Sequence, residues 1–193
     1  MIWPQAAAAF NQEGGLIETI SAIALLVAGL VALARFRGTS RLYIGLVCLL
    51  LAERELEAEV YTEGSVPFVV LSWIDLVLDV TAVRIVLAAI VIGGLLWHGI
   101  PNGIRAFKIR APFLKVFVLA GSVAVLAQLL EEISELFHEY LSVAMVTRLF
   151  VMEETLEMYF SIGILAAVLI GWPKPKSEEK QNDQQYRRLP HAR

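Results

Sequence analysis

Long apolar runs separated by short charged segments constrain this chain more than any other feature. The runs cover about 16–36, 42–61, 80–98, 113–137 and 149–172. A helix needs roughly 20 apolar residues to cross about 30 Å of hydrocarbon. Hydrophobic residues make up 58% of the 193, which is too apolar for a soluble domain of this size. The sequence therefore predicts an all-α integral membrane protein, with 1–172 forming a bundle of about five transmembrane helices.

Two segments fall outside this pattern. The stretch 67–79 is apolar but is interrupted by Asp75 and Asp79 and is too short to span alone. We interpret it as an interfacial or re-entrant helix that leads into the third span, with a sixth, tilted span as the alternative. The segment 173–193 is polar and contains proline, which is typical of a disordered tail.

The lysines and arginines predict the orientation. They gather in the first loop, the third loop and the tail, which lie on one side of the membrane if there are five spans. Short cytoplasmic loops carry an excess of these residues. We therefore expect the N-terminus outside and the C-terminus in the cytoplasm. No basic segment or cleavage site typical of a signal peptide precedes the first run, so we expect that run to be retained.

On this topology every acidic residue except the three in the tail falls toward the outer side of the membrane. Crowded carboxylates in a low dielectric raise one another's pKa, so protons or cations must be held among them. Counting about 1.5 Å per residue from the inner interface places several charges inside the hydrocarbon, about 18–26 Å up. These residues are Glu53, Arg54, Glu57, Arg84, Glu131, Glu132 and Glu157. An unpaired charge at that depth costs several kcal/mol, so we expect a buried carboxylate and arginine cluster.

Carboxylates on converging helices also form metal sites in bundles, and Glu135 and His138 make one Glu-x-x-His element. The candidate metal ligands are Glu53, Glu57, Glu131, Glu132, Glu135, His138, Glu154 and Glu157, and the candidate ion-pair partners are Arg54, Arg84 and Arg148. Such an oxygen-rich set suits Ca²⁺, Mn²⁺ or Mg²⁺ better than zinc, and one histidine leaves iron open. We interpret Glu13, Glu55, Glu59, Glu63 and Glu139 as a solvated rim.

Three short acidic motifs carry a resemblance. They are Gly14-Gly15-Leu16-Ile17-Glu18, Glu53-Arg54-Glu55-Leu56-Glu57 and Glu153-Glu154-Thr155-Leu156-Glu157. With these helix-end patterns the chain resembles uncharacterised multi-pass bacterial inner-membrane proteins. The resemblance implies a bacterial inner-membrane location and no activity.

Three functions fit these patterns. The first is a membrane protein that binds or handles a cation, either a divalent metal or protons. The second is a non-catalytic accessory or assembly subunit of a larger membrane complex, or of a homo-oligomer. The third is a carboxylate-bridged metalloenzyme at the outer leaflet, which the single outer-side histidine disfavours. No motif for nucleotide binding, hydrolysis or nucleic-acid recognition is present. The lipid bilayer is the one partner that the composition requires.

Overall fold

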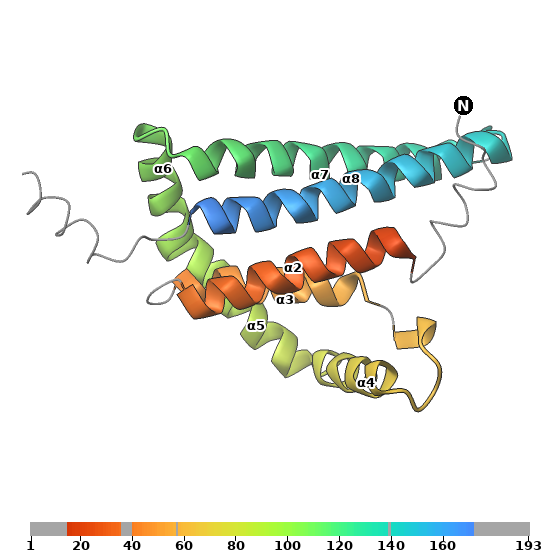
Figure 1. Ribbon diagram of the computed structural model, residues 1–193, viewed down its shortest axis with the longest axis horizontal. Helices are drawn as coiled ribbons and strands as arrows, with labels where there is room; N and C mark the ends of the chain where they lie inside the picture. The colour runs from red at the N-terminus through yellow and green to blue at the C-terminus, as the bar shows by residue number, and fades with distance from the viewer. Residues whose placement is uncertain (1–14, 36–39, 57, 139, 172–193) are drawn as a thin grey trace, which may run out of the picture.

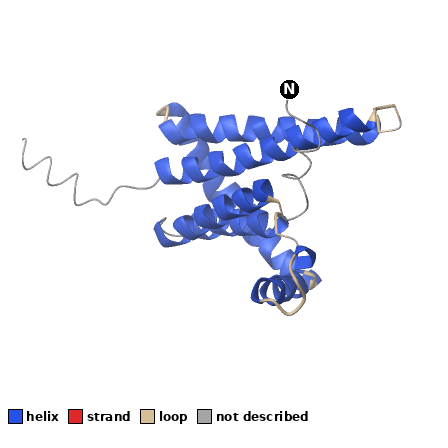
Figure 2. Cartoon of the chain, turned by 45° about the vertical axis from the view of Figure 1, so that its right-hand side comes forward, coloured by secondary structure: helices blue, strands red, loops and turns tan. Residues whose placement is uncertain are grey.

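A computed structural model describes residues 15–35, 40–56, 58–138 and 140–171 (Figure 1). These residues form helices joined by short turns, with no strand among them (Figure 2). The all-helical class expected from the apolar runs is therefore confirmed. The predicted tail, 173–193, lies outside the described residues.

Each predicted apolar run contains helix, but only 16–36 and 113–137 match a helix closely, and α8 begins six residues before the predicted 149. In chain order they are α2 (Leu16–Arg35), α3 (Ser40–Arg54), a 3₁₀ turn (Ala58–Val60), α4 (Val66–Leu78), α5 (Thr81–Gly94), a π-helical turn (Leu95–Gly99), α6 (Ile100–Lys108), α7 (Pro112–Leu136) and α8 (Val143–Ile170). Three helices are long and apolar enough to cross a membrane, namely Leu16–Arg35, Thr81–Lys108 and Pro112–Leu136. The α5–α6 helix is continuous through the π-helical turn and so exceeds the predicted run 80–98.

Helix α3 is shorter than the apolar run that predicted it. It ends at Arg54, and its 15 residues extend about 22 Å, less than the hydrocarbon thickness. The backbone N–H of Leu56 donates to the carbonyl oxygen of Glu53 at 2.9 Å, so the chain leaves the helix through a tighter turn. The charged residues that follow Ala52 therefore lie at the end of α3 rather than within a longer helix.

Helices α7, α8, α2 and α3 pack side by side in that order, and α5 packs on α3 (Figure 1). The core is made of small side chains: Ala28 and Ala32 of α2 and Cys48 of α3 contact Val168 of α8. Small residues let helix backbones approach closely, which is how membrane helices associate without a hydrophobic driving force. The row of helices is therefore held by close backbone contacts.

Helix α4 diverges from this row together with the first half of α5 (Figures 1 and 2). A turn with Gly64 at φ +81° precedes it, and the Ser65 hydroxyl caps it by accepting from the Phe68 N–H at 3.4 Å. Proline at the start of the helix is compatible with this cap. Asp79 ends α4, and α5 begins two residues later at Thr81.

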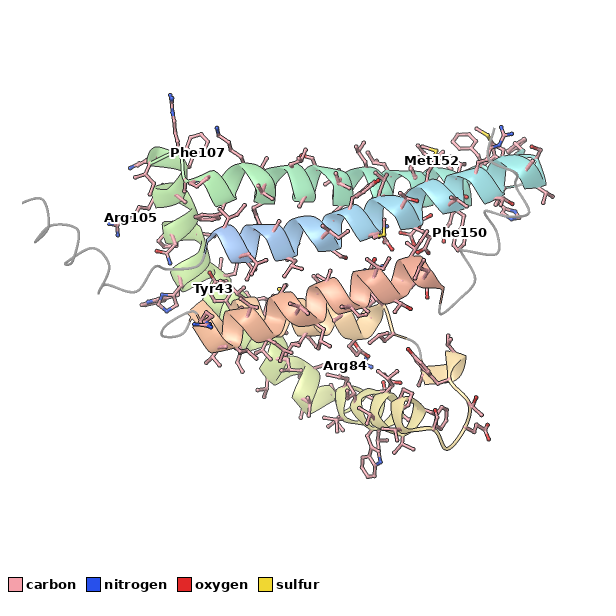
Figure 3. All side chains as sticks on the ribbon, viewed as in Figure 1. Tyr43, Arg84, Arg105, Phe107, Phe150 and Met152 are labelled. Atoms are coloured by element: carbon pink, nitrogen blue, oxygen red, sulfur yellow. The ribbon has the colours of Figure 1, made fainter. Side chains whose placement is uncertain are left out.

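The connections bring the acidic helix ends together. Helix α2 begins, α3 ends, α7 ends and α8 begins at the same end of the molecule (Figure 1). Arg105 of α6 lies at the opposite end (Figure 3). The separation of acidic and basic residues along the sequence thus becomes a separation in space.

Candidate functional site

The acidic residues at the end of α3 divide between two groups on opposite sides of that helix. Glu53 lies in the last turn of α3, and Glu55 lies in the turn that follows the helix. Glu53 faces α4 and α5, where it interacts with Asp75 and Arg84. Glu55 faces α2 and α8, where it interacts with Glu18 and Glu157. The single charged layer expected from the sequence is therefore two separate groups.

The first, which we call the Arg84 group, consists of Glu53, Asp75, Asp79 and Arg84. The Arg84 Nη2 pairs with Asp79 Oδ1 at 2.5 Å, and its Nε donates to the Leu78 carbonyl oxygen at 2.5 Å. Glu53 interacts with both Asp75 and Arg84. This group therefore combines an ion pair with two neighbouring carboxyl groups.

The Arg84 group lies at the polar end of an open groove between α3 and α5. The groove has a volume of about 540 Å³. Glu53 and Arg84 belong to its lining, and the rest of the lining is apolar: Val47, Leu50, Leu51, Leu78, Leu87, Ala88, Val91 and Ile92. Arg84 lies between α3 and α4 in Figure 3. The groove is thus amphipathic, with charge at one end and hydrocarbon along its walls.

The second, which we call the Glu55 group, consists of Glu18, Arg54, Glu55, Glu154 and Glu157. Glu154 interacts electrostatically with Glu157, Glu18 and Glu55, and Glu157 interacts with Arg54. Three helices, α2, α3 and α8, thus supply four carboxyl groups against one guanidinium. The four glutamate side chains are half-buried, and Arg54 is exposed.

Glu55 lies in the turn that follows α3. The pKa of its carboxyl group is raised to about 7, and burial is the largest cause. The nearby carboxylates of Glu157 and Glu18 also raise this pKa, together by more than Arg54 lowers it. A carboxyl group with such a pKa exchanges its proton near neutral pH. The sequence interpretation of Glu55 as a rim residue missed this environment, because it depends on the packing of α2 and α8 against the end of α3.

Two buried hydroxyl groups lie one helical turn inward from the Glu55 group. Ser21 follows Glu18 by three residues on α2, and Ser161 follows Glu157 by four on α8. Both side chains are only 1% exposed, and neither hydroxyl has a hydrogen-bond partner among the described residues. Buried hydroxyl groups without a protein partner are typical sites for a bound water. Polar character therefore extends inward from the carboxyl groups by about one turn.

Of the other predicted site residues that the structure describes, Glu131 borders the Glu55 group and the remaining four are exposed. Glu131 of α7 is half-buried and accepts from Gln128 Nε2 at 2.5 Å, and it interacts with Glu153 and Glu157 of α8. Four other predicted site residues have exposed side chains, namely Glu132, Glu135, His138 and Arg148. Glu57 lies outside the described residues. Arg84, one of the predicted ion-pair partners, pairs with Asp79, because α5 packs on the far side of α3 from α2 and α8.

The burial and metal ligation expected from the sequence are not observed in the described part of the chain. Every described aspartate, glutamate and arginine is half-buried or exposed, because the helices form an open row in which one side of each acidic helix end remains uncovered. In residues 15–35, 40–56, 58–138 and 140–171, no three His, Cys, Asp or Glu side chains are arranged to hold a metal ion.

Glu55→Gln is expected to change the pH dependence of stability. The pKa of Glu55 is about 7 in the folded protein and 4.5 for a free carboxyl group. The contribution of Glu55 to the stability of the wild type is therefore fully present below about pH 4.5 and is lost as the pH rises through about 7. Each pKa unit corresponds to about 1.4 kcal/mol, and screening of this half-exposed group reduces the total to about 1 kcal/mol. The variant should therefore melt roughly 2–4 °C higher than wild type at about pH 8.

Thermal melts of both proteins at about pH 8 and about pH 4.5 test this expectation. The two proteins should melt together at the lower pH, where Glu55 is protonated and glutamine resembles it. An equal difference at both pH values would contradict the assignment of the titration to Glu55.

Comparison with known proteins adds no relative. No protein-family model, curated protein or solved structure matches the chain.

Proposed function

We propose that this chain is a multi-pass inner-membrane protein that handles cations through its outer-side carboxyl groups, and that the cation is the proton. The observation that carries the proposal is the convergence of Glu18, Glu55, Glu154 and Glu157 from three helices beside one arginine. Four carboxylates near one positive charge bind protons more tightly than isolated carboxylates do.

Two features support protons over a divalent metal. The Glu55 carboxyl has a pKa of about 7, so it gains and loses its proton near neutral pH. The described residues contain no arrangement of three or more ligands suited to a metal ion. Oxygen ligands for Ca²⁺ or Mg²⁺ must surround the ion, which these exposed helix ends do not do.

We propose that the Glu55 group binds and releases protons from the outer side and does not conduct them across the membrane. Inward from Ser21 and Ser161 the facing residues of α2 and α8 are apolar, including Leu25, Ala28 and Val168. An apolar layer without polar groups does not carry protons. Protonation of the Glu55 group would instead change the repulsion between α2, α3 and α8, which is a means of sensing outer pH.

One observation favours the accessory-subunit alternative. Helix α5 contains no fully buried residue, and Trp97, Ile85 and Phe107 along the α5–α6 helix are 80%, 63% and 74% exposed. Lipid or another membrane subunit would cover this surface. The two functions are compatible, because a subunit of a complex can carry a proton-binding group.

Proton uptake measures the proposed function directly. The purified protein in lipid nanodiscs is titrated from about pH 8 to about pH 6, and proton binding is followed with a pH-indicator dye. The Glu55→Gln, Glu157→Gln double variant should take up about one proton fewer than wild type per chain over this range, because two members of the group no longer titrate. Glu132→Gln, on the exposed face of α7, is the matched control.

Equal uptake by the double variant and wild type would contradict the proposal. Elemental analysis of the same preparations separates protons from metals. A divalent metal bound at one per chain in wild type and absent from the double variant would replace the proton with that metal.

A further inference from the structure

The groove between α3 and α5 combines features of a binding site for a membrane amphiphile. Its apolar walls come from α3 and from the α5–α6 helix, which is long and apolar enough to cross a membrane. Along α5 it extends from Arg84 to Ile92, which corresponds to about 12 Å. A volume of about 540 Å³ is within the range of small-molecule sites. The groove therefore suits part of an acyl chain lying along the helices.

The charges at the polar end restrict the headgroup. Arg84 is the one cation of the Arg84 group, against the three carboxyl groups of Glu53, Asp75 and Asp79. This excess of carboxyl groups disfavours an anionic headgroup. A headgroup with both a phosphate and a cation complements this arrangement.

Hydrogen-bonding capacity selects among such headgroups. A guanidinium has five N–H donors, and Arg84 uses two of them for Asp79 and Leu78, which leaves donors for a phosphate. Asp79 is 73% exposed and accepts from Arg84 through one oxygen, so it has further acceptor capacity for an ammonium group. A primary ammonium donates three hydrogen bonds, whereas a quaternary ammonium donates none. The carboxyl groups therefore favour a primary amine.

We propose that the groove binds a bilayer phospholipid with an ethanolamine headgroup, with its phosphate at Arg84, its ammonium at Asp79 and an acyl chain between α3 and α5. This binding is independent of the proton uptake proposed above, since the Arg84 group and the Glu55 group lie on opposite sides of α3. The lipid would fill the space that separates α5 from α3 and support the divergent α4–α5 segment.

Two alanines of α5 provide a matched test. Ala88 lines the groove, whereas its neighbour Ala89 does not, and both are exposed. Phenylalanine at Ala88 fills the groove, and phenylalanine at Ala89 adds the same apolar surface elsewhere on the helix. Because neither position is packed against another helix, both variants should fold.

Wild type, Ala88→Phe, Ala89→Phe and Asp79→Asn are reconstituted in bilayers with equal amounts of ethanolamine, choline and glycerol phospholipids. The proteins are then extracted in mild detergent, and the retained lipids are counted by phosphate assay and identified by mass spectrometry. Wild type and Ala89→Phe should retain ethanolamine lipid over each of the other two lipids at a ratio of about ten to one, and Ala88→Phe should lose this enrichment. Asp79→Asn should retain ethanolamine and choline lipids equally.

Three results would overturn the proposal. Equal ethanolamine enrichment in Ala88→Phe and Ala89→Phe would show that the lipid binds elsewhere. Retention of the three lipids by wild type in their bulk ratio would show that the charges at Arg84 do not select a headgroup. A dimer in wild type that Ala88→Phe dissociates, with no change in retained lipid, would show that a second copy fills the groove.

Discussion

Replacing Gly45 with leucine should separate α2 from α3 and lower the melting temperature by roughly 2–12 °C. A Cβ atom at Gly45 would lie 2.6 Å from Leu33 Cγ and 2.7 Å from Leu33 Cδ2, closer than side chains pack. Across the same contact, a Cβ at Gly29 would lie 3.2 Å from the Gly45 carbonyl oxygen. Overpacking of a close contact costs about 1–3 kcal/mol, which corresponds to this change in melting temperature.

Cys48 reports on the same contact without a second substitution. Its side chain is 3% exposed and packs against Ala28, Ala32 and Val168 in the core. Gly45→Leu should therefore also accelerate labelling of Cys48 by a small maleimide. Gly121→Leu is the control, because a Cβ atom at Gly121 would meet nothing within 4 Å. Equal melting temperatures for Gly45→Leu and Gly121→Leu would refute the close contact between α2 and α3.

Gly94→Val should release α4 and α5 from the rest of the bundle. A Cβ atom at Gly94 would lie 2.5 Å from the Cβ atom of Tyr43, and neither atom can rotate away. Because α5 contains no fully buried residue, this approach to α3 is a principal attachment of the helix. Loss of the attachment should increase amide hydrogen exchange in α5 by about tenfold, which corresponds to about 1.4 kcal/mol.

Hydrogen exchange with mass spectrometry localises this effect. Exchange in α7 and α8 should stay at the wild-type rate, because α5 does not pack on either helix. Gly93→Val is the matched control, since a Cβ atom at Gly93 would meet nothing within 4 Å. The role of Gly94 would be disproved if both variants exchanged alike in α5.

Much of the helical architecture is present in local sequence. The apolar run predicted at 16–36 contains α2, Leu16–Arg35, and the run predicted at 113–137 matches α7, Pro112–Leu136, to within one residue. Such runs form helices because a helix satisfies its own backbone hydrogen bonds, whatever its neighbours are. The end of α3 at Arg54 was not predicted, because the apolar count does not detect a turn closed by a single backbone hydrogen bond.

The sequence predicted which kinds of residue make up the candidate site, but not which of them come together. That acidic residues gather at helix ends on one side follows from their positions in the sequence. Which of them meet depends on the neighbours of each helix. Asp79 and Arg84 are five residues apart across a break between two helices, and helical periodicity does not pair them. Glu55, interpreted as a rim residue, has the pKa of about 7 because of α2 and α8.

The sequence by itself determined an all-helical, strongly apolar chain with acidic and basic residues at opposite helix ends, since composition and hydrophobic runs act locally. The tertiary structure alone decided that the charged layer divides at α3 into the Arg84 group and the Glu55 group. The reason is that α3 lies between α2 and α5, so Glu53, in the last turn of α3, and Glu55, in the turn that follows it, meet different partners. Which helices are neighbours in the bundle depends on contacts between residues far apart in the sequence, and hydrophobic periodicity does not predict these contacts.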